Sequence, residues 1–348
     1  MSQRTNLSIR FFRLWISSSA CLSLISYFGI VAPNCCIAAD DAPTIRVGVI
    51  GLDTSHSAAF TKELNKSEAT DAGPRLRVVA AYPFGSRDIE SSASRIPSIT
   101  AEMKALDVEI VDSVADLLKR VDCVLLETND GKLHLQQAME VFASKKPVFI
   151  DKPVAASLAD VLAIFQAAKD SGTPMFSSSS LRYGGNVQAI RNGLVGKVLG
   201  CDAFSPCALE PSHSDLYWYG IHGVESLFTC MGPGCESVTR VSTENFDFVT
   251  GKWSDGRIGT FRGIRSGTSG YGGTAFGDKG IVALEKFQGY KPLVLVISEF
   301  FRTKQQPVSA EETIEIYAFM EAAAESKRQG GIPVSLESVI AKSQKSAN

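Results

Sequence analysis

The sequence lacks the features that mark several large classes of protein. It has no long basic run, no convincing internal repeat and no long low-complexity tract. With 35 Lys and Arg against 37 Asp and Glu, the formal net charge is −2, so nothing suggests a nucleic-acid-binding surface. Disorder is disfavoured as well, because it needs less hydrophobicity and more net charge than 45% hydrophobic and 21% charged residues provide.

The cysteines match no zinc-binding pattern. Three of the eight lie within the first 36 residues, and five remain in the rest of the chain: Cys123, Cys201, Cys207, Cys230 and Cys235. Five is an odd number, and the spacings fit no metal site. An exported protein could pair some of them. Cys123, which begins an apolar run, is instead expected to be a small buried hydrophobe.

Residues 1–39 are typical of a targeting segment rather than of a folded domain. Three arginines precede the uncharged, mostly apolar run Leu14–Ala32, and small residues follow before Asp40. This order predicts a secretory signal peptide, cleaved after Ala38 or Ala39, and hence an exported or periplasmic protein. The run is nearly long enough to span a bilayer, so an uncleaved membrane anchor is the alternative. No later segment predicts a membrane span in the mature chain.

The length of 348 residues suits two domains. From residue 44 to about residue 180, short apolar runs alternate with helical stretches, which implies right-handed βαβ units and a parallel sheet. We therefore expect an α/β protein in which residues 40–180 form a doubly wound Rossmann domain. Its predicted strands are Ile45–Ile50, Leu76–Tyr82, Val108–Val111, Cys123–Leu126, Val148–Ile150 and Thr173–Phe176.

The pattern changes after about residue 185. Few helices are expected there before the long amphipathic helix Glu311–Arg328. We expect residues 181–335 to form an α+β domain with a mixed or antiparallel open sheet, followed by a tail over residues 336–348. The predicted strands are Val198–Phe204, Val238–Val249, Arg257–Arg265, Gly280–Leu284 and Leu293–Ile297.

Unusual residues follow three of the predicted parallel strands. They are the segment Gly51–His56, the segment Glu127–Gly131 with the nearby His134, and the tripeptide Asp151–Pro153. In an open parallel sheet, ligands bind at the carboxyl ends of the strands. These three segments are therefore expected to face a ligand-binding cleft.

Their order resembles that of the glucose–fructose oxidoreductase/inositol dehydrogenase family, known as Gfo/Idh/MocA, and the resemblance runs from about residue 44 to 335. Thr128-Asn129, His134 and Lys146–Pro153 are similar to the family's TPN…H…GK-hydrophobic-EKP stretch, with Asp151 in place of the usual Glu. Leu181-Arg182-Tyr183 is similar to the RF or RY that follows the last Rossmann strand. Each motif is weak alone, but their order and spacing together are specific.

The resemblance implies a nicotinamide cofactor, NAD or NADP, and hydride transfer on a sugar, polyol or related small molecule. By position, Lys152 matches the family's lysine near the reacting carbon, and His222 matches its general acid/base. A histidine can remove the hydroxyl proton, and an ammonium can stabilise the developing alkoxide. The residues expected at the cofactor are Gly51, Asp53, Ser55, His56, Thr128, Asn129, His134, Asp151 and Pro153. Arg182, Tyr183, Trp218 and Tyr219 are expected at the substrate, and no metal is expected.

Several of these residues have a plainer interpretation. A lysine before proline can be a solvated surface residue, and a histidine beside aromatic residues can be a satisfied core histidine. His134 is expected to pack near the cofactor loop rather than to catalyse, and His213 could contact ligand from a polar loop. Asp53 and His56 could share a helix face and bind a metal, but helix capping is the preferred explanation.

The glycine fingerprint departs from the family's pattern. Family members show G-x-G-x-x-G/A after the first strand, but Asp53 and His56 replace the second and third small residues here. The second glycine lets the backbone approach a pyrophosphate, so Asp53 puts a side chain and a negative charge in that place. The second strand also ends in Tyr82 rather than an acidic residue, and Arg87 beyond it would favour NADP.

A further departure concerns the histidine. Trp218 stands where many family members carry an aspartate four residues before the catalytic histidine, so that partner is missing unless Asp215 or Glu225 supplies a carboxylate.

The first functional hypothesis is an NAD(P)-dependent oxidoreductase acting on a sugar or polyol. The alternative is an exported carbohydrate-binding or otherwise non-redox protein that has lost dinucleotide binding. Family members commonly associate through the open face of the second sheet, so a homo-oligomer is a further expectation.

Overall fold

The computed structural model describes residues 43–66 and 73–346. The predicted signal peptide lies outside the described residues. Within those residues, no helix combines the length and the apolar character needed to cross a membrane.

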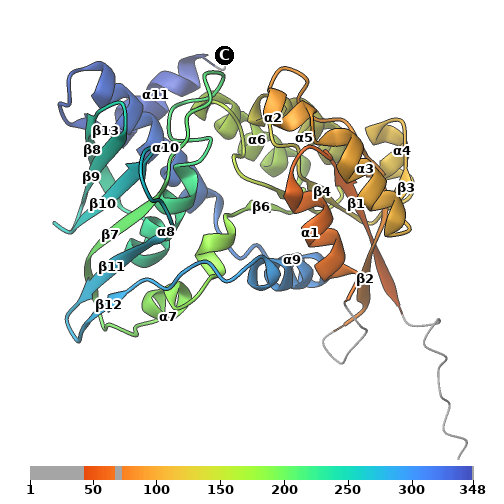
Figure 1. Cartoon of the computed structure of the whole chain (residues 1–348), viewed down its shortest axis with the longest axis horizontal. Helices are drawn as coiled ribbons and strands as arrows, with labels where there is room; N and C mark the ends of the chain where they lie inside the picture. The colour runs from red at the N-terminus through yellow and green to blue at the C-terminus, as the bar shows by residue number, and fades with distance from the viewer. Residues whose placement is uncertain (1–42, 67–72, 347–348) are drawn as a thin grey trace, which may run out of the picture. The chain divides into compact units, whose positions relative to one another are not determined.

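A parallel six-stranded sheet forms the N-terminal half of the described chain (Figure 1). Its spatial order, β3-β2-β1-β4-β5-β6, is that of a doubly wound Rossmann sheet, as predicted. β4 and β5 are buried along their whole length, which explains their continuous apolar sequences. The strands are β1 (Thr44–Ile50), β2 (Arg75–Tyr82), β3 (Glu109–Ile110), β4 (Cys123–Leu126), β5 (Val148–Ile150) and β6 (Met175–Ser177).

Helices connect these strands. Two of them begin at serine caps, because the hydroxyls of Ser113 and Ser157 accept the backbone N–H groups of Asp116 and Asp160. The helices are α1 (Ser55–Leu64), α2 (Glu90–Ala93), α3 (Ile96–Ala105), α4 (Val114–Leu118), α5 (His134–Ala143) and α6 (Leu158–Ser171).

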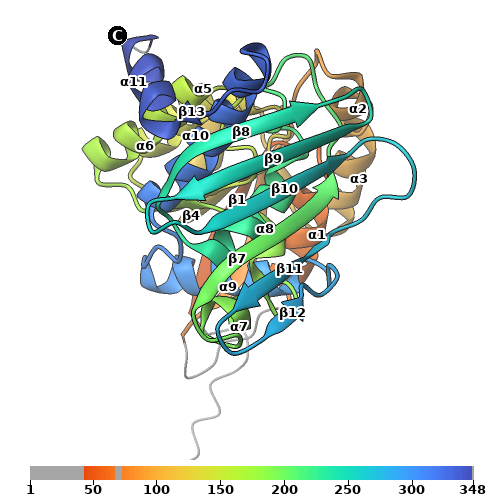
Figure 2. The same ribbon diagram turned by 90° about the vertical axis from the view of Figure 1, so that its left-hand side faces the viewer.

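A seven-stranded mixed sheet forms the C-terminal half, and its strand order is β12-β11-β7-β10-β9-β8-β13. β7 and β10 pair in parallel and the other neighbours pair antiparallel, which confirms the predicted mixed sheet. One face of this sheet is open, and helices α8 (Ile221–Met231) and α10 (Ala310–Arg328) lie behind it (Figure 2). The strands are β7 (Val198–Pro206), β8 (Cys235–Ser242), β9 (Phe246–Trp253), β10 (Ile258–Ile264), β11 (Gly272–Gly277), β12 (Ile281–Ala283) and β13 (Val334–Ser335).

Two predicted strands are wrong. Val238–Val249 is not one strand but most of the hairpin β8–β9, which turns where the N–H of Thr243 donates to the carbonyl of Phe246. Leu293–Ile297 belongs to helix α9 (Lys291–Thr303), whose apolar side chains join the core of the Rossmann half. Periodicity alone does not distinguish a short apolar run in a strand from one in a buried helix.

Other segments carry more structure than the sequence pattern predicts. Residues 336–346, expected to be a tail, form helix α11 (Leu336–Ser346), and Leu336 and Val339 are buried. Helix α8, the short helices η3 (Ser180–Tyr183) and α7 (Val187–Arg191), and strand β11 were also not predicted. Of these, α8 bears directly on the site, because it carries His222.

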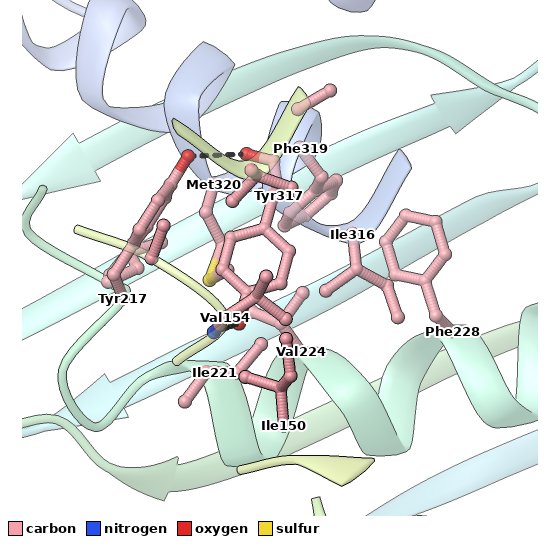
Figure 3. Packing of buried hydrophobic residues seen from close by; sticks show 14 of the residues in the cluster. Ile150, Val154, Tyr217, Ile221, Val224, Phe228, Ile316, Tyr317, Phe319 and Met320 are labelled. Atoms are coloured by element: carbon pink, nitrogen blue, oxygen red, sulfur yellow. Dashed lines mark hydrogen bonds between the residues drawn. The ribbon is translucent and has the colours of Figure 1, made fainter. Parts of the chain in front are cut away.

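One hydrophobic cluster joins the two halves (Figure 3). Ile150 and Val154, on either side of Lys152, pack with residues of α8 and with Tyr317 of α10. The backbone N–H of Val154 donates to the Tyr317 hydroxyl at 2.7 Å, and the Tyr217 hydroxyl donates to the Tyr317 carbonyl at 3.2 Å. The segment that carries Lys152 is therefore fixed against the helices of the second half.

Candidate functional site

A pocket of about 270 Å³ lies where the strand ends of the Rossmann sheet meet α8. A larger hollow of about 1170 Å³ includes Thr173 and Met175 at the start of β6, away from the strand carboxyl ends where ligands bind in this fold. The smaller pocket contains much of the predicted site. Its lining includes Ser55, His56, Asn129, Lys152, Trp218, Tyr219 and His222.

Lys152 lies at the end of β5, where it is 8% exposed and lines the pocket. The peptide bond to Pro153 is cis. The Lys152 ammonium lies 3.8 Å from a carboxylate oxygen of Asp151, and His56 Nδ1 lies 2.7 Å from the same oxygen. Burial opposes ionisation of Asp151, but the charges of His56 and Lys152 outweigh it and hold the carboxyl pKa below its ordinary value. The Asp151 carboxylate therefore places a negative charge beside the Lys152 ammonium.

His222 reaches the same pocket from the first turn of α8 and is also 8% exposed. Its Nδ1 lies 2.8 Å from the Ser179 hydroxyl. Burial lowers the pKa of His222 well below its ordinary value, and the charges of Lys152 and His56 lower it further. The imidazole is therefore neutral at pH 7 and is able to accept a proton.

Neither of the two carboxylates considered as a partner for His222 takes that role. Asp215 forms ion pairs with Lys327 and Arg240. Glu225 accepts hydrogen bonds from Ser178 and Arg182. The ring contacts a hydroxyl instead, and the charge of Asp151, which raises the pKa of His222, does not offset the lowering by burial.

Asp53 bridges three loops at the strand ends. Its carboxylate is buried and accepts the backbone N–H of Ser86 at 2.9 Å and that of Asn129 at 3.0 Å. The loops after β1, β2 and β4 are thereby joined. Gly85 makes room for this contact, because a Cβ there would lie 2.3 Å from Asp53 Cγ. The side chain that caps α1 is that of Thr54, so the capping role expected for Asp53 is wrong.

This arrangement does not fit a dinucleotide in the position usual for a Rossmann fold. In that position, the backbone at the second glycine approaches the pyrophosphate, which lies at the helix N-terminus. Here Asp53 occupies the approach, and its side chain already binds two backbone N–H groups. A carboxylate at about 4 Å from a diphosphate charge costs on the order of 1–4 kcal/mol. The Asp53 side chain holds the loops together at the place where the cofactor would cross them.

Other residues predicted at the cofactor serve the packing of the loops. Gly51 has φ +91°, and a Cβ there would lie 2.4 Å from the backbone nitrogen of Thr128. The His134 ring lies 2.6 Å from the carbonyl of Thr128 and 3.1 Å from that of Val154, so it connects the loops after β4 and β5. His134 is therefore placed to pack beneath these loops, outside the pocket lining.

The residues predicted at the substrate separate into two groups. Trp218 and Tyr219 line the pocket, whereas Arg182 is buried in ion pairs with Glu225 and Glu312. Tyr183, beside Arg182, is also absent from the pocket lining. Arg182 thus joins η3 to helices α8 and α10 and does not face the pocket.

His213 lies outside this pocket too. It is buried, and its Nε2 accepts the backbone N–H of Gly131 at 3.1 Å. Its ring lies 5.0 Å from that of Trp218. His213 therefore packs against Trp218, which lines the pocket, without lining the pocket itself.

Sequence reasoning missed several aromatic residues of the pocket. Tyr271 and Tyr290 come from loops without a periodic pattern, and both line it. The Tyr290 ring lies edge-on to His56 at 4.7 Å, and those of Tyr219 and Tyr271 lie 5.4 and 5.8 Å from His222. An aromatic wall beside polar groups suits a ligand with both apolar faces and hydroxyl groups.

Glu127 was also missed as a site residue, although it begins a segment singled out in the sequence. It directly follows β4, and its side chain is fully buried. Neither carboxylate oxygen has a hydrogen-bond partner among the described residues. Burial, and secondly the charge of Asp151, raise the pKa of Glu127.

A Rossmann sheet joined to a mixed open sheet, with a lysine from the first half and a histidine from the second lining one pocket, defines a two-domain α/β fold. Residues 45–178 match the family model described as "Oxidoreductase family, NAD-binding Rossmann fold". The Rossmann half of the chain thus matches the model of the Gfo/Idh/MocA family.

Individual proteins agree with this assignment. The chain is 28% identical over 108 residues to 2,7-anhydro-N-acetylneuraminate hydratase of Escherichia coli, covering 30% of this chain and 28% of the relative. It is 31% identical over 162 residues to inositol 2-dehydrogenase of Gluconacetobacter diazotrophicus, covering 45% of this chain and 44% of the relative. The matched stretch is thus less than half the length of either relative. The structure of a probable dehydrogenase from Thermotoga maritima shares the fold, with a TM-score of 0.69 at 20% identity over 85% of this chain and 100% of that one.

Proposed function

We propose that the chain is an enzyme that acts by acid–base chemistry on a sugar, a polyol or a related small molecule. The observation that carries this proposal is the burial of Lys152 and a neutral His222, one from each half, in one pocket. The pocket volume of about 270 Å³ lies just below the roughly 300–1,000 Å³ typical of pockets for drug-sized ligands. It suits a ligand of about the size of a monosaccharide.

His222 removes a proton from the bound molecule, because its lowered pKa leaves the imidazole free to accept one. The contact of Nδ1 with Ser179 leaves Nε2 as the nitrogen for this transfer. The Lys152 ammonium stabilises the negative charge that develops on oxygen. The aromatic rings of the pocket pack against the apolar face of the ligand.

We propose further that this chemistry does not use a dinucleotide bound across the strand ends. The bridge from Asp53 to Ser86 and Asn129 supports this, because it occupies the approach to a pyrophosphate.

An NAD(P)-dependent oxidoreductase is the second candidate. It is supported by the match of residues 45–178 to an NAD-binding oxidoreductase family and by the retained Lys152.

For either candidate, the pattern of residues 1–39 supports export as a further proposal. Detection of a mature chain beginning near Asp40 in the periplasmic fraction tests it.

Calorimetric titration of the chain from Asp40 onward with NAD, NADH, NADP and NADPH separates the two candidates. We expect no binding by the parent chain and measurable binding by Asp53→Gly. Tight binding by the parent chain would instead favour the oxidoreductase.

The acid–base step is tested by incubating the chain with aldoses and ketoses in D2O and following deuterium incorporation next to the carbonyl by NMR. His222→Gln and Lys152→Ala should abolish incorporation. His213→Gln, which alters a buried histidine outside the pocket, should retain it. Equal incorporation by His222→Gln and the parent chain would refute the assignment of His222 as the base.

A further inference from the structure

We propose that His56, Glu127 and Asp151 form a binding site for one divalent cation next to the pocket that His56 lines. Each of the three residues offers one ligand atom, and these atoms all lie within 4.8 Å of one another. All three side chains are buried. This proposal is independent of the proposed function, because binding of the cation is measured without any substrate.

The fold brings these residues together. Leu126 and Ile150 are paired neighbours at the ends of β4 and β5, and Glu127 and Asp151 directly follow them. Adjacent strands lie about 4.8 Å apart, so two carboxylates that follow paired residues come side by side. His56 joins them from the first turn of α1, the helix that follows the neighbouring strand β1.

The lack of a hydrogen-bond partner for the buried Glu127 carboxyl group is the observation that points to a cation. Both of its oxygens are buried without a hydrogen-bond partner among the described residues. A buried carboxylate without a partner is costly, and buried charges in proteins are paired or coordinate metals. A divalent cation bound by Glu127 and Asp151 would provide that compensation.

Lys152 does not replace such a cation. Its ammonium lies 3.8 Å from Asp151, which is longer than the roughly 3.2 Å limit of a direct hydrogen bond. Of the ion pairs found among the described residues, none includes Glu127. The charges of Lys152 and Asp53 act on Glu127 in opposite directions.

The residue types select the class of cation. One imidazole and two carboxylates suit zinc, manganese or another divalent transition metal. Three protein ligands leave coordination positions open. His56 itself lines the pocket, so a cation here would lie close to a bound molecule and could act as a Lewis acid on it. The His56 ring also packs against the rings of Phe60 and Tyr290.

The experiment uses the untagged chain from Asp40 onward, stripped with EDTA and titrated separately with Zn²⁺, Mn²⁺ and Co²⁺. We expect one equivalent to bind and to raise the melting temperature, with Co²⁺ giving visible absorption bands. Glu127→Gln and His56→Gln should weaken binding at least about tenfold, the scale on which even residues around a metal centre act. Asp278→Asn, which alters an exposed carboxylate outside the cluster, should bind as the parent does.

Folding of the variants is monitored independently. In EDTA, Glu127→Gln should melt no lower than the parent, because the substitution removes a buried group without a partner. Its melting temperature should then not respond to metal. The proposal is overturned if the parent binds none of the three cations, or if Glu127→Gln binds them as tightly as the parent.

Discussion

Replacing Asp53 by alanine tests whether its carboxylate holds the strand-end loops together. The change removes the acceptor for the N–H groups of Ser86 and Asn129. Hydrogen bonds to charged groups contribute about 1.5–3 kcal/mol each, so the two together are worth about 3–6 kcal/mol. Part of this is offset because burial opposes ionisation of Asp53 and raises its pKa. We therefore expect Asp53→Ala to lower the free energy of unfolding by about 2–4 kcal/mol.

The assay is urea unfolding of the chain from Asp40 onward, followed by circular dichroism, with stability obtained by linear extrapolation. Asp278→Ala is the matched control, because exposed Asp278 also accepts a backbone N–H, that of Lys197 at 2.8 Å. We expect this control to lose about 1 kcal/mol or less. If Asp53→Ala is no less stable than Asp278→Ala, the carboxylate does not hold the loops, and the argument against a dinucleotide loses its basis.

Three further predictions concern other parts of the chain. Gly51→Ala should destabilise the protein more than Gly193→Ala in the same urea assay, because both have positive φ but only Gly51 would bring a Cβ against backbone, 2.4 Å from Thr128. Because the pKa of His222 is lowered in the folded chain, the unfolded chain binds the proton first, so stability should fall as the pH drops below about 6.5; His222→Gln should flatten this dependence in pH-dependent melting curves. Arg182→Ala should cost about 3–5 kcal/mol in urea unfolding, because it leaves the buried carboxylate of Glu225 without its ion-pair partner, although Glu312 keeps its ion pair with Arg191.

The Rossmann half was predictable from the sequence because its strands are continuous apolar runs and its helices are periodic. The mixed sheet was predictable as a class but less well in detail. In the run Leu293–Ile297, the choice between strand and helix depends on what it packs against, namely the Rossmann core. The sequence pattern of that run contains no information about this distant partner.

The candidate site shows the same limit. Lys152 and His222 were recognised by resemblance, and the replacement of a glycine by Asp53 was visible in the printed sequence. The partners of Asp53 were not visible, because Ser86 lies 33 residues and Asn129 lies 76 residues further along the chain. The isolation of Glu127 was equally hidden, since an absent partner leaves no pattern in a sequence.

Helix α9 has a consequence for any attempt to divide this protein. The chain leaves the Rossmann half after β6, builds most of the mixed sheet, and returns to the first core through Phe300 and Phe301 before α10 begins. A fragment ending at residue 180 would expose the surface that these rings cover, including Phe176, whose ring lies 4.8 Å from that of Phe300. The two halves are therefore interleaved along the chain, and neither should be expected to remain monomeric in solution when expressed without the other.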